Sequence, residues 1–292
     1  MFKNLITLSC FAFLLVGCNK MGDSPKEANA GGEAIFANGL DREYILYLPE
    51  SYDASIPTPM VLNFHGFGGQ ADEYMEYADM REVAEDEGFI LVYPQGSLLD
   101  GFSHWNATLL GGDNKSSTDD FGFVEELIET ISGDYNIDSK RIYACGYSNG
   151  GMMAYGLANH RSELVAAVAS VSGTMLDFSE KTTHPMPILH LHGTSDGVIR
   201  YEGGSDFSSA QSVLDYWIEF NGTEETPSVE SDRSGKPVIE HYVYAGGENG
   251  VSVEHYKYID GDHVWFDATY KGKTTSELIW SFFSRYDLDG LR

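Results

Sequence analysis

The pattern of apolar and polar residues along the chain switches repeatedly between two forms. Short apolar runs typical of buried strands alternate with longer segments in which apolar residues recur every three or four positions, as on one face of a helix. In the segment 119–135, for example, Phe123, Leu127, Ile128 and Ile131 share one such face. Strands are expected at 44–48, 60–64, 89–93, 141–147, 165–171, 188–191 and 253–259, and helices at 71–88, 119–135, 149–160, 208–220 and 275–286.

This alternation predicts the fold class. Strands that are joined through helices lie parallel to one another, and a parallel sheet needs helices on both faces to bury its apolar side chains. The sequence therefore predicts an α/β protein with a mostly parallel central sheet. Two stretches interrupt the alternation: 95–118, which is rich in Gly, Ser and Asn, and 223–250, which is of mixed polarity.

The beginning of the chain has the pattern of an export signal. Lys3 precedes an apolar run from Leu5 to Gly17, which is too short to span a bilayer. The run ends in Leu-Val-Gly-Cys, and this tetrapeptide resembles a bacterial lipobox. The resemblance implies that Cys18 becomes the lipid-modified first residue of the mature protein. The alternative is an ordinary secretory signal in which Cys18 has no such role.

Composition then divides the chain into three parts. Residues 1–17 form the expected signal peptide, and 18–33, which are polar and rich in Gly, Ala, Ser and Pro, form a flexible tether. The remaining 34–292 suffice for one domain of α/β size, since the chain is 42% hydrophobic. The expected location is that of an exported lipoprotein, anchored to a membrane and facing the periplasm or the cell surface.

Charge limits the partners of the protein. The net charge is −27, with 45 acidic against 18 basic residues. Such a chain repels nucleic acids and anionic membrane surfaces, so we expect no nucleic-acid partner and no membrane contact except through the lipid. Strongly anionic substrates are also disfavoured, although a local pocket can differ from the mean field. The oligomeric state stays open.

The three cysteines give no disulfide framework. Cys10 and Cys18 belong to the leader and its boundary, whereas Cys145 lies in the expected strand 141–147. The alternation along that strand makes Cys145 a core thiol rather than a nucleophile.

The strongest chemical pattern follows that strand. Residues Gly146 to Gly150 have the form G-x-S-x-G between an apolar strand and a helix. The two glycines allow a sharp turn without a clash of Cβ atoms. The turn holds the Ser148 hydroxyl at the head of a helix, where free amides and the helix dipole favour a developing negative charge. The pattern predicts a serine hydrolase with Ser148 as nucleophile.

A serine nucleophile needs a base and an acid, which in proteins with this turn follow in the order Ser, Asp or Glu, His. Asp196, in the turn after the strand 188–191, is the expected acid, and Asp206 is a weaker alternative. His263, which follows the last strand and a glycine turn, is the expected base among nine histidines. Asp262 ranks below Asp196 because neighbours in sequence rarely present both side chains correctly.

Two backbone amides are expected to bind the oxyanion. The first belongs to Asn149, directly after the nucleophile. The second belongs to the glycine-rich stretch 65–69, where Phe67 is the expected donor and Gly66 stays an alternative.

No metal or cofactor is expected. His190 and His192 form a weak zinc pattern without a nearby third ligand, and the Asp-rich segment 287–290 is too short for a calcium loop. The chain also lacks the glycine-rich fingerprints of nucleotide-binding folds.

Several segments resemble the secreted esterases that include polyhydroxybutyrate-depolymerase-like enzymes and feruloyl or acetylxylan esterases. They are PMVLNFHGFGG, WNA, TDDFGFVEELI, YNIDSKRIYACGYSNGGMMAYGLA, LHLHGTSD and GDHVW, spread over residues 40–285. The resemblance implies an α/β-hydrolase fold with Ser148, Asp196 and His263 as the triad.

The implied activity is hydrolysis of carboxylic esters through an acyl-enzyme, on feruloyl or acetyl esters of polysaccharides or on short-chain esters. The alternatives are a polyester depolymerase, a peptidase of the same fold, and a non-catalytic binding lipoprotein.

The resemblance also suggests roles outside the triad. Trp105 matches a position near the pocket, and Trp265 follows the base, so both are candidate substrate contacts; the alternative is simple loop packing. Asp119 and Asp120 match an acidic pair for which we expect a capping role at the following helix.

Overall fold

The computed structural model describes residues 32–37, 40–109, 115–179 and 182–292. The expected signal peptide, Cys18 and most of the expected tether lie outside these residues. Strand β1 (Gly32–Ala37) begins within the stretch expected to be tether, two residues before position 34.

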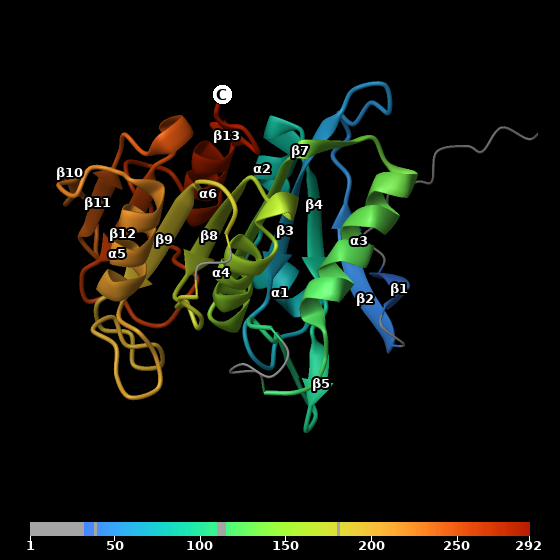
Figure 1. Ribbon diagram of the computed structural model, residues 1–292, viewed down its shortest axis with the longest axis horizontal. Helices are drawn as coiled ribbons and strands as arrows, with labels where there is room; N and C mark the ends of the chain where they lie inside the picture. The colour runs from blue at the N-terminus through green and yellow to red at the C-terminus, as the bar shows by residue number, and fades with distance from the viewer. Residues whose placement is uncertain (1–31, 38–39, 110–114, 180–181) are drawn as a thin grey trace, which may run out of the picture.

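A ten-stranded sheet forms the middle layer of the molecule (Figure 1). Besides β1 it contains β2 (Leu40–Tyr47), β3 (Thr58–Phe64), β4 (Ile90–Pro94), β7 (Ile137–Tyr147), β8 (Ala167–Val171), β9 (Ile188–Gly193), β10 (Ser228–Asp232), β11 (Ile239–Tyr244) and β12 (Val253–Tyr258). The spatial order is β1-β2-β4-β3-β7-β8-β9-β12-β11-β10. The strands from β4 to β12 pair in parallel, and antiparallel strands extend both ends. The predicted α/β class is confirmed.

Helices cover both faces of the sheet (Figure 1). On one face α3 (Asp120–Asp134), α4 (Asn149–His160) and α5 (Ala210–Asn221) share a core with the side chains of β3 that point to that side. On the other face lie α1 (Ala71–Tyr77), α2 (Arg81–Glu87) and α6 (Thr275–Phe283). Within β3, Met60 and Leu62 belong to the first core and Val61 to the second, as strand alternation requires.

The helix expected at 71–88 is wrong, because the structure has two helices there. The chain breaks between α1 and α2, and the Tyr93 hydroxyl satisfies the backbone at the break. It donates to the carbonyl of Ala78 at 2.9 Å and accepts from the N–H of Met80 at 3.1 Å. The apolar periodicity continues across the break, so the sequence pattern alone does not show it.

The two interrupting stretches also contain regular structure. Between 95 and 118 the chain forms a hairpin of β5 (Ser97–Leu99) and β6 (Phe102–His104), and between 223 and 250 it forms β10 and β11. The remaining short elements are the 3-10 turns Ser162–Leu164 and Glu248–Gly250 and the strands β13 (Tyr286–Asp287) and β14 (Gly290–Leu291).

The two acidic residues before α3 have different structural roles. Asp119 caps the helix, since its side chain accepts the N–H of Gly122 at 3.0 Å, as expected. Asp120 does not cap. It is buried, forms a salt bridge with Arg42 at 2.9 Å and accepts the N–H of Asn106 at 2.8 Å.

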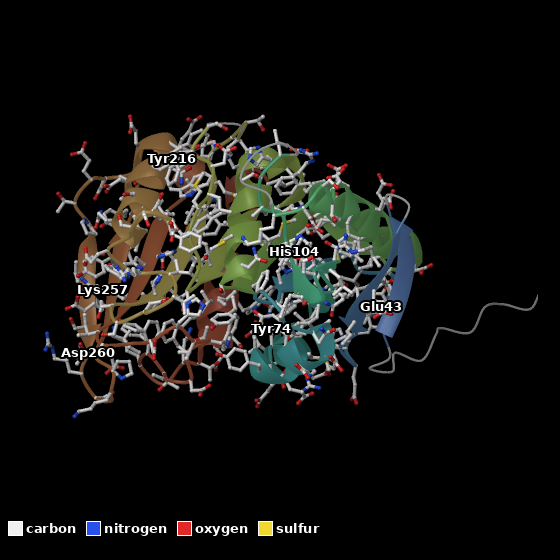
Figure 2. All side chains as sticks on the ribbon, turned by 90° about the horizontal axis from the view of Figure 1, so that it is seen from below. Glu43, Tyr74, His104, Tyr216, Lys257 and Asp260 are labelled. Atoms are coloured by element: carbon white, nitrogen blue, oxygen red, sulfur yellow. The ribbon has the colours of Figure 1, made fainter. Side chains whose placement is uncertain are left out.

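The loops at the carboxyl ends of the parallel strands gather at one edge of the sheet. The view onto this edge has Tyr74 and His104 near its middle and Asp260, after β12, at one end (Figure 2). In open parallel sheets this edge is where binding and chemistry occur. Among the described residues, no helix has the length and apolar content needed to cross a membrane.

Candidate active site

The turn between β7 and α4 holds Ser148 in an unusual backbone conformation. Its φ is 54° and its ψ is −117°, a region that a residue with a side chain rarely adopts. The flanking glycines are required for steric reasons, because a Cβ on Gly150 would lie 1.9 Å from the carbonyl O of Phe64, and one on Gly146 would lie 2.5 Å from Gly150. The turn therefore lifts the hydroxyl out of the strand at the head of the buried helix α4.

Ser148, His263 and Asp196 form one line of hydrogen bonds. The Ser148 Oγ lies 3.0 Å from His263 Nε2, and His263 Nδ1 lies 2.7 Å from Asp196 Oδ2. The three residues follow β7, β9 and β12, strands of the central parallel part of the sheet. Because an ionised carboxylate only accepts, the Nδ1 atom carries the proton and Nε2 is free to accept from the serine hydroxyl.

Asp196 is held as a carboxylate by its surroundings. Its side chain has no solvent exposure, and Oδ1 accepts the N–H groups of Val198 and Ile199, both at 2.8 Å. Burial raises the pKa of Asp196, but hydrogen bonds from His192, His263 and Val198 lower it more, so the pKa lies well below the ordinary range of an aspartate. The acid is therefore charged at neutral pH.

Neither alternative acid, Asp262 or Asp206, forms a hydrogen bond with the His263 ring. Asp262 accepts the backbone N–H of His263 at 2.8 Å, and Asp206 is exposed and accepts from the Ser205 hydroxyl. The structure thus brings together the three residues that chain order selected.

The glycine-rich loop after β3 lies against the nucleophile. A Cβ on Gly66 would be 3.4 Å from the Ser148 Cβ. In the described chain, neither the N–H of Phe67 nor that of Asn149 donates a hydrogen bond to another protein group, and the same is true of Gly66. These amides are available to an oxyanion beside Ser148.

His65 fixes the shape of this loop. Its Nδ1 donates to the carbonyl of Gly66 at 2.7 Å, and its Nε2 accepts the N–H of Gly96 at 2.9 Å. Burial lowers the pKa of His65 to about 4, so the ring stays neutral and keeps both bonds at neutral pH. Strand β6 holds the same loop from outside, because Gly68 donates to the Ser103 carbonyl at 2.7 Å.

The predicted role of Trp105 as a substrate contact has no support in this geometry. Its ring is 1% exposed and packs against Phe64, His65 and Phe123. The β5–β6 hairpin carries the tryptophan into the core, where the indole N–H donates to the carbonyl of His65 at 2.9 Å. Trp105 therefore supports the glycine-rich loop from beneath.

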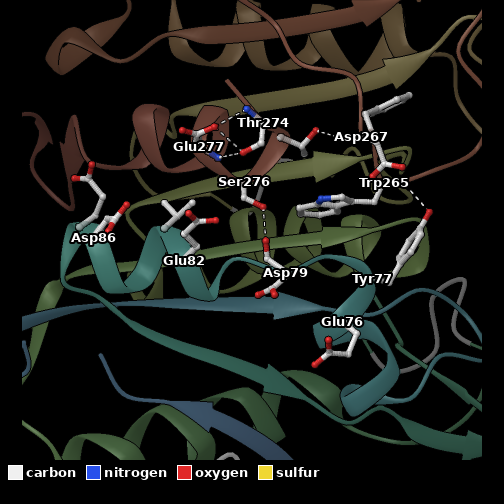
Figure 3. A pocket seen from close by; sticks show the side chains of 14 residues that line it. Glu76, Tyr77, Asp79, Glu82, Asp86, Trp265, Asp267, Thr274, Ser276 and Glu277 are labelled. Carbon is white, nitrogen blue, oxygen red and sulfur yellow. Dashed lines mark hydrogen bonds between the residues drawn. The ribbon is translucent and has the colours of Figure 1, made fainter. Parts of the chain in front are cut away.

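Trp265 is also buried, at 5% exposed, with its ring edge-on to Tyr74. It borders a cavity of about 580 Å³, which lies between α1, α2 and the segment 265–277 (Figure 3). None of Ser148, Asp196 and His263 lines this cavity. Its walls carry the carboxylates of Glu76, Asp79, Glu82, Asp86, Glu87, Asp267 and Glu277. The expected role of Trp265 in substrate binding has no support in this geometry.

Two exposed aromatic rings lie instead on the glycine-rich loop and on the β5–β6 hairpin next to it. Phe67 and Phe102 stack with ring centroids 5.9 Å apart and are 48% and 58% exposed. A cavity of about 200 Å³ lies between the glycine-rich loop and α1, with Tyr77 and Tyr147 in its wall; its lining includes Gly66 and Phe67 but no residue of the triad. In the sequence, only the place of Phe67 in the glycine-rich stretch pointed to these rings. The exposure of the Phe102 ring depends on how the β5–β6 hairpin folds back, which the sequence pattern does not show.

The remaining candidates are accounted for by packing. Cys145 is fully buried, as expected for a core thiol, and burial raises its pKa. His190 and His192 hydrogen-bond to each other at 3.1 Å. Across the described ranges, no three potential ligands are grouped so as to hold a metal ion.

Comparison with known proteins decides the family. The model of the family "Esterase PHB depolymerase" matches residues 42–218, more than half of the chain. The chain belongs to the esterase PHB depolymerase family. The resemblance drawn from the sequence motifs is confirmed.

Relatives within reach of sequence comparison are esterases by name. A bifunctional acetylxylan esterase/xylanase of Neocallimastix patriciarum is 28% identical over 257 residues, which are 86% of this chain but 34% of that protein. The chain thus spans about a third of the length of that relative. Feruloyl esterase D of Neurospora crassa is 25% identical over 286 residues, covering 93% of this chain and 90% of that protein.

Solved structures agree on the fold. An acetyl xylan esterase from Aspergillus awamori superposes with a TM-score of 0.64 at 16% identity, covering 87% of this chain and 99% of the other. A carboxylesterase of Bacillus cereus gives 0.52 at 13% identity, covering 83% and 93%. At such identities the likeness shows the α/β-hydrolase fold alone, which confirms the expected architecture.

Proposed function

We propose that this member of the family is a serine esterase that hydrolyses carboxylic esters through an acyl-enzyme. The observation that carries the proposal is the unbroken line Ser148–His263–Asp196, with bonds of 3.0 and 2.7 Å, beside amides that donate to no other described group. Each component that acyl transfer needs is then present at one point: nucleophile, base, acid and oxyanion donors.

In the first half of the reaction the ester acylates the serine. His263 Nε2 takes the hydroxyl proton as Ser148 Oγ attacks the carbonyl carbon, and the carbonyl π electrons move onto oxygen. The N–H groups of Phe67 and Asn149 bind that oxyanion. When the tetrahedral intermediate collapses, the carbon–oxygen bond to the alcohol breaks and His263 returns its proton to the leaving oxygen.

In the second half, water takes the place of the alcohol. His263 accepts a proton from the water as its oxygen attacks the acyl carbon, and then protonates Ser148 Oγ as the acid leaves. Asp196 stays ionised throughout and stabilises the protonated ring. One ester and one water give one acid and one alcohol.

The substrates that fit best are feruloyl or acetyl esters of polysaccharides, or short-chain esters. The relatives are named for such activities. The exposed rings of Phe67 and Phe102, and an aromatic-walled cavity of about 200 Å³ that the glycine-rich loop also lines, suit a phenolic acyl group or a sugar ring. A net charge of −27 favours neutral esters over strongly anionic ones.

Polyester cleavage is the second candidate, favoured by the description of the family itself. A polyhydroxyalkanoate chain is a series of neutral short-chain esters, so it makes the same demands on the triad. Polysaccharide esters and polyesters therefore differ in the part of the substrate that binds around the triad, not in the ester that the triad cleaves.

A substrate panel tests the proposal. Wild type and Ser148→Ala would be assayed on acetylxylan, methyl ferulate, polyhydroxybutyrate, nitrophenyl esters from C2 to C16, and a peptide set. We expect hydrolysis of polysaccharide esters and of the shorter nitrophenyl esters, and a loss of more than about 10³-fold in Ser148→Ala. A mutant that keeps most of its activity, or a wild type active only on peptides, overturns it.

We also propose that the protein is exported and anchored through lipid on Cys18, facing the periplasm or the cell surface, with the signal peptide at 1–17. The support is the order of charge, apolar run and Leu-Val-Gly-Cys in the leader. Such an anchor predicts that wild type partitions into detergent while Cys18→Ser is released in soluble form. Equal partitioning of the two forms contradicts the anchor.

A further inference from the structure

A row of buried polar side chains continues the Ser148–His263–Asp196 line into the interior. Beyond Asp196 it passes through His192 and His190 on β9 to Tyr155 on α4. The two histidines point the same way because they are two residues apart on one strand. They are 0% and 1% exposed, and the acyl-transfer steps above use neither.

The direction of these hydrogen bonds follows from the end nearest to the triad. His192 Nε2 lies 2.8 Å from the carbonyl O of Ile199, and a carbonyl only accepts, so Nε2 carries the proton. His192 Nδ1 then accepts from His190 Nε2 at 3.1 Å. His190 Nδ1 in turn accepts the hydroxyl of Tyr155 at 2.8 Å. Each ring is thereby held in one tautomer, with its N–H directed along the row towards the end at Asp196.

The His192 N–H also faces the acid itself. Nε2 lies 3.1 Å from Asp196 Oδ2, the same oxygen that accepts from His263. Ile199, whose carbonyl takes the His192 hydrogen bond, donates its own N–H to Oδ1. His192 therefore contacts both the carboxylate and the loop that orients it.

We propose that His192 is a positioning residue: its Nε2–H fixes the loop 196–199 and the Asp196 carboxylate so that Oδ2 stays aimed at His263. The row through His190 to Tyr155 keeps the His192 ring in the tautomer that this role requires. The role rests on the proposed esterase function, since it acts on the acid of that triad. It requires no proton transfer along the row.

The chain offers a matched control in His255. This ring is equally buried, at 2% exposed, and packs on His190 with centroids 5.3 Å apart. Its Nδ1 donates to the backbone carbonyl of His190, and its Nε2 accepts the Tyr201 hydroxyl, both at 2.9 Å. Loss of His255 therefore removes a comparable buried ring without removing a contact to Asp196.

The experiment compares His192→Asn, His192→Gln, His192→Leu and His255→Leu for kcat, KM and thermal unfolding on one nitrophenyl ester. The amide nitrogen of Gln reaches the position of Nε2, whereas that of Asn reaches only the position of Nδ1. We expect kcat to fall about 10- to 100-fold in the Asn and Leu variants, with KM within about twofold, because an ångström of misplacement carries penalties of this order. His192→Gln should keep kcat within about threefold of wild type, and His255→Leu should unfold earlier with unchanged kcat.

Three results would overturn the positioning role: kcat unchanged in His192→Asn, kcat equally low in the Gln and Asn variants, or kcat lowered as much by His255→Leu. The Asn and Gln pair keeps the test decisive if His192→Leu does not fold. A parallel measurement on Ser148→Ala separates the two proposals. If that variant is inactive while all His192 variants match wild type, only the positioning role fails, whereas an active Ser148→Ala removes the esterase assignment itself.

Discussion

Asn149 and Trp105 are joined by a reciprocal pair of hydrogen bonds. The Trp105 N–H donates to the Asn149 side-chain oxygen at 2.8 Å, and the Asn149 side-chain nitrogen donates to the Trp105 carbonyl at 3.0 Å. The indole of the same tryptophan donates to the carbonyl of His65, which opens the glycine-rich loop. One residue thus links the amide that follows the nucleophile to the loop that carries the second proposed oxyanion donor.

Trp105→Phe should loosen that link. The variant keeps a buried ring but loses the indole N–H, so we expect kcat to fall about 10-fold with little change in KM, less than the 10²–10³ typical of removing an oxyanion donor outright. Steady-state kinetics on a nitrophenyl ester measures this. Trp217→Phe is the matched control, because Trp217 is fully buried in α5 and its indole N–H has no hydrogen-bond partner within the described structure. Equal kinetic losses in both variants would contradict the link.

Gly150→Ala should abolish the fold of the turn. The new Cβ would lie 1.9 Å from the carbonyl O of Phe64, a backbone atom that cannot move aside without shifting β3. We expect little soluble protein, or a free energy of unfolding lowered by more than about 3 kcal/mol, as for severe overpacking. Gly133→Ala in α3 is the control, since nothing lies within 4 Å of its Cβ position; it should be neutral or stabilising by up to about 1 kcal/mol. Urea unfolding of both variants measures the two changes in the free energy of unfolding, and equal changes would contradict the steric argument.

The triad could be predicted from sequence because each member has a local cue. Ser148 lies in a turn that only small neighbours permit, and Asp196 and His263 follow strands in the required order. Their mutual distances are consequences of the parallel sheet, which places the ends of β7, β9 and β12 along one edge.

What the sequence could not show depends on packing between distant segments. Trp105 was a candidate substrate contact because of its place in a long loop, but the β5–β6 hairpin folds it under the glycine-rich loop. The break between α1 and α2 is stabilised by Tyr93, which belongs to β4. Phe102 and Tyr77 carry no motif, and only the fold brings Phe102 against Phe67 and Tyr77 against Tyr147. Burial of an aromatic ring in a loop is a tertiary property that local periodicity does not encode.

Stability should fall on acidification because three histidines are buried in neutral form. Burial lowers the pKa of His65 to about 4 and of His255 to about 3, and places that of His190 well below its ordinary value. Below about pH 6.5 these histidines bind protons in the unfolded chain but stay neutral in the folded chain. Each of them therefore lowers the free energy of unfolding by up to about 1.4 kcal/mol for every pH unit of acidification. The contribution of these neutral rings to stability is fully present above pH 6.5. For His65 it is lost as the pH falls towards 4, and for His190 and His255 the loss continues to lower pH.

The variant His255→Leu isolates one of these groups. Urea unfolding between pH 7 and pH 4.5 should give a slope of stability against pH that is smaller than that of wild type by about 1.4 kcal/mol per pH unit at the acidic end. Parallel slopes in the two proteins would show that His255 is protonated in the folded state.

Phe102→Ala should alter substrate preference without altering the chemical step. The Phe102 ring stacks on Phe67 and is 58% exposed beside the proposed oxyanion loop. We expect KM for methyl ferulate to rise about threefold to tenfold, since an aromatic contact contributes about 0.5–1.5 kcal/mol, while kinetics on nitrophenyl acetate stay within twofold. Leu98→Ala, on the same hairpin and 68% exposed, serves as the control. Identical changes for both esters would place the ring outside the substrate site.

The assignment of Ser148 as the nucleophile is tested most directly by mass spectrometry of the protein after reaction with a fluorophosphonate. We predict a single adduct on the peptide that contains Ser148, absent in Ser148→Ala and formed far more slowly in His263→Ala, with loss of esterase activity in step with labelling. An enzyme that hydrolyses esters without forming this adduct, or that carries it on another residue, would contradict the proposed mechanism.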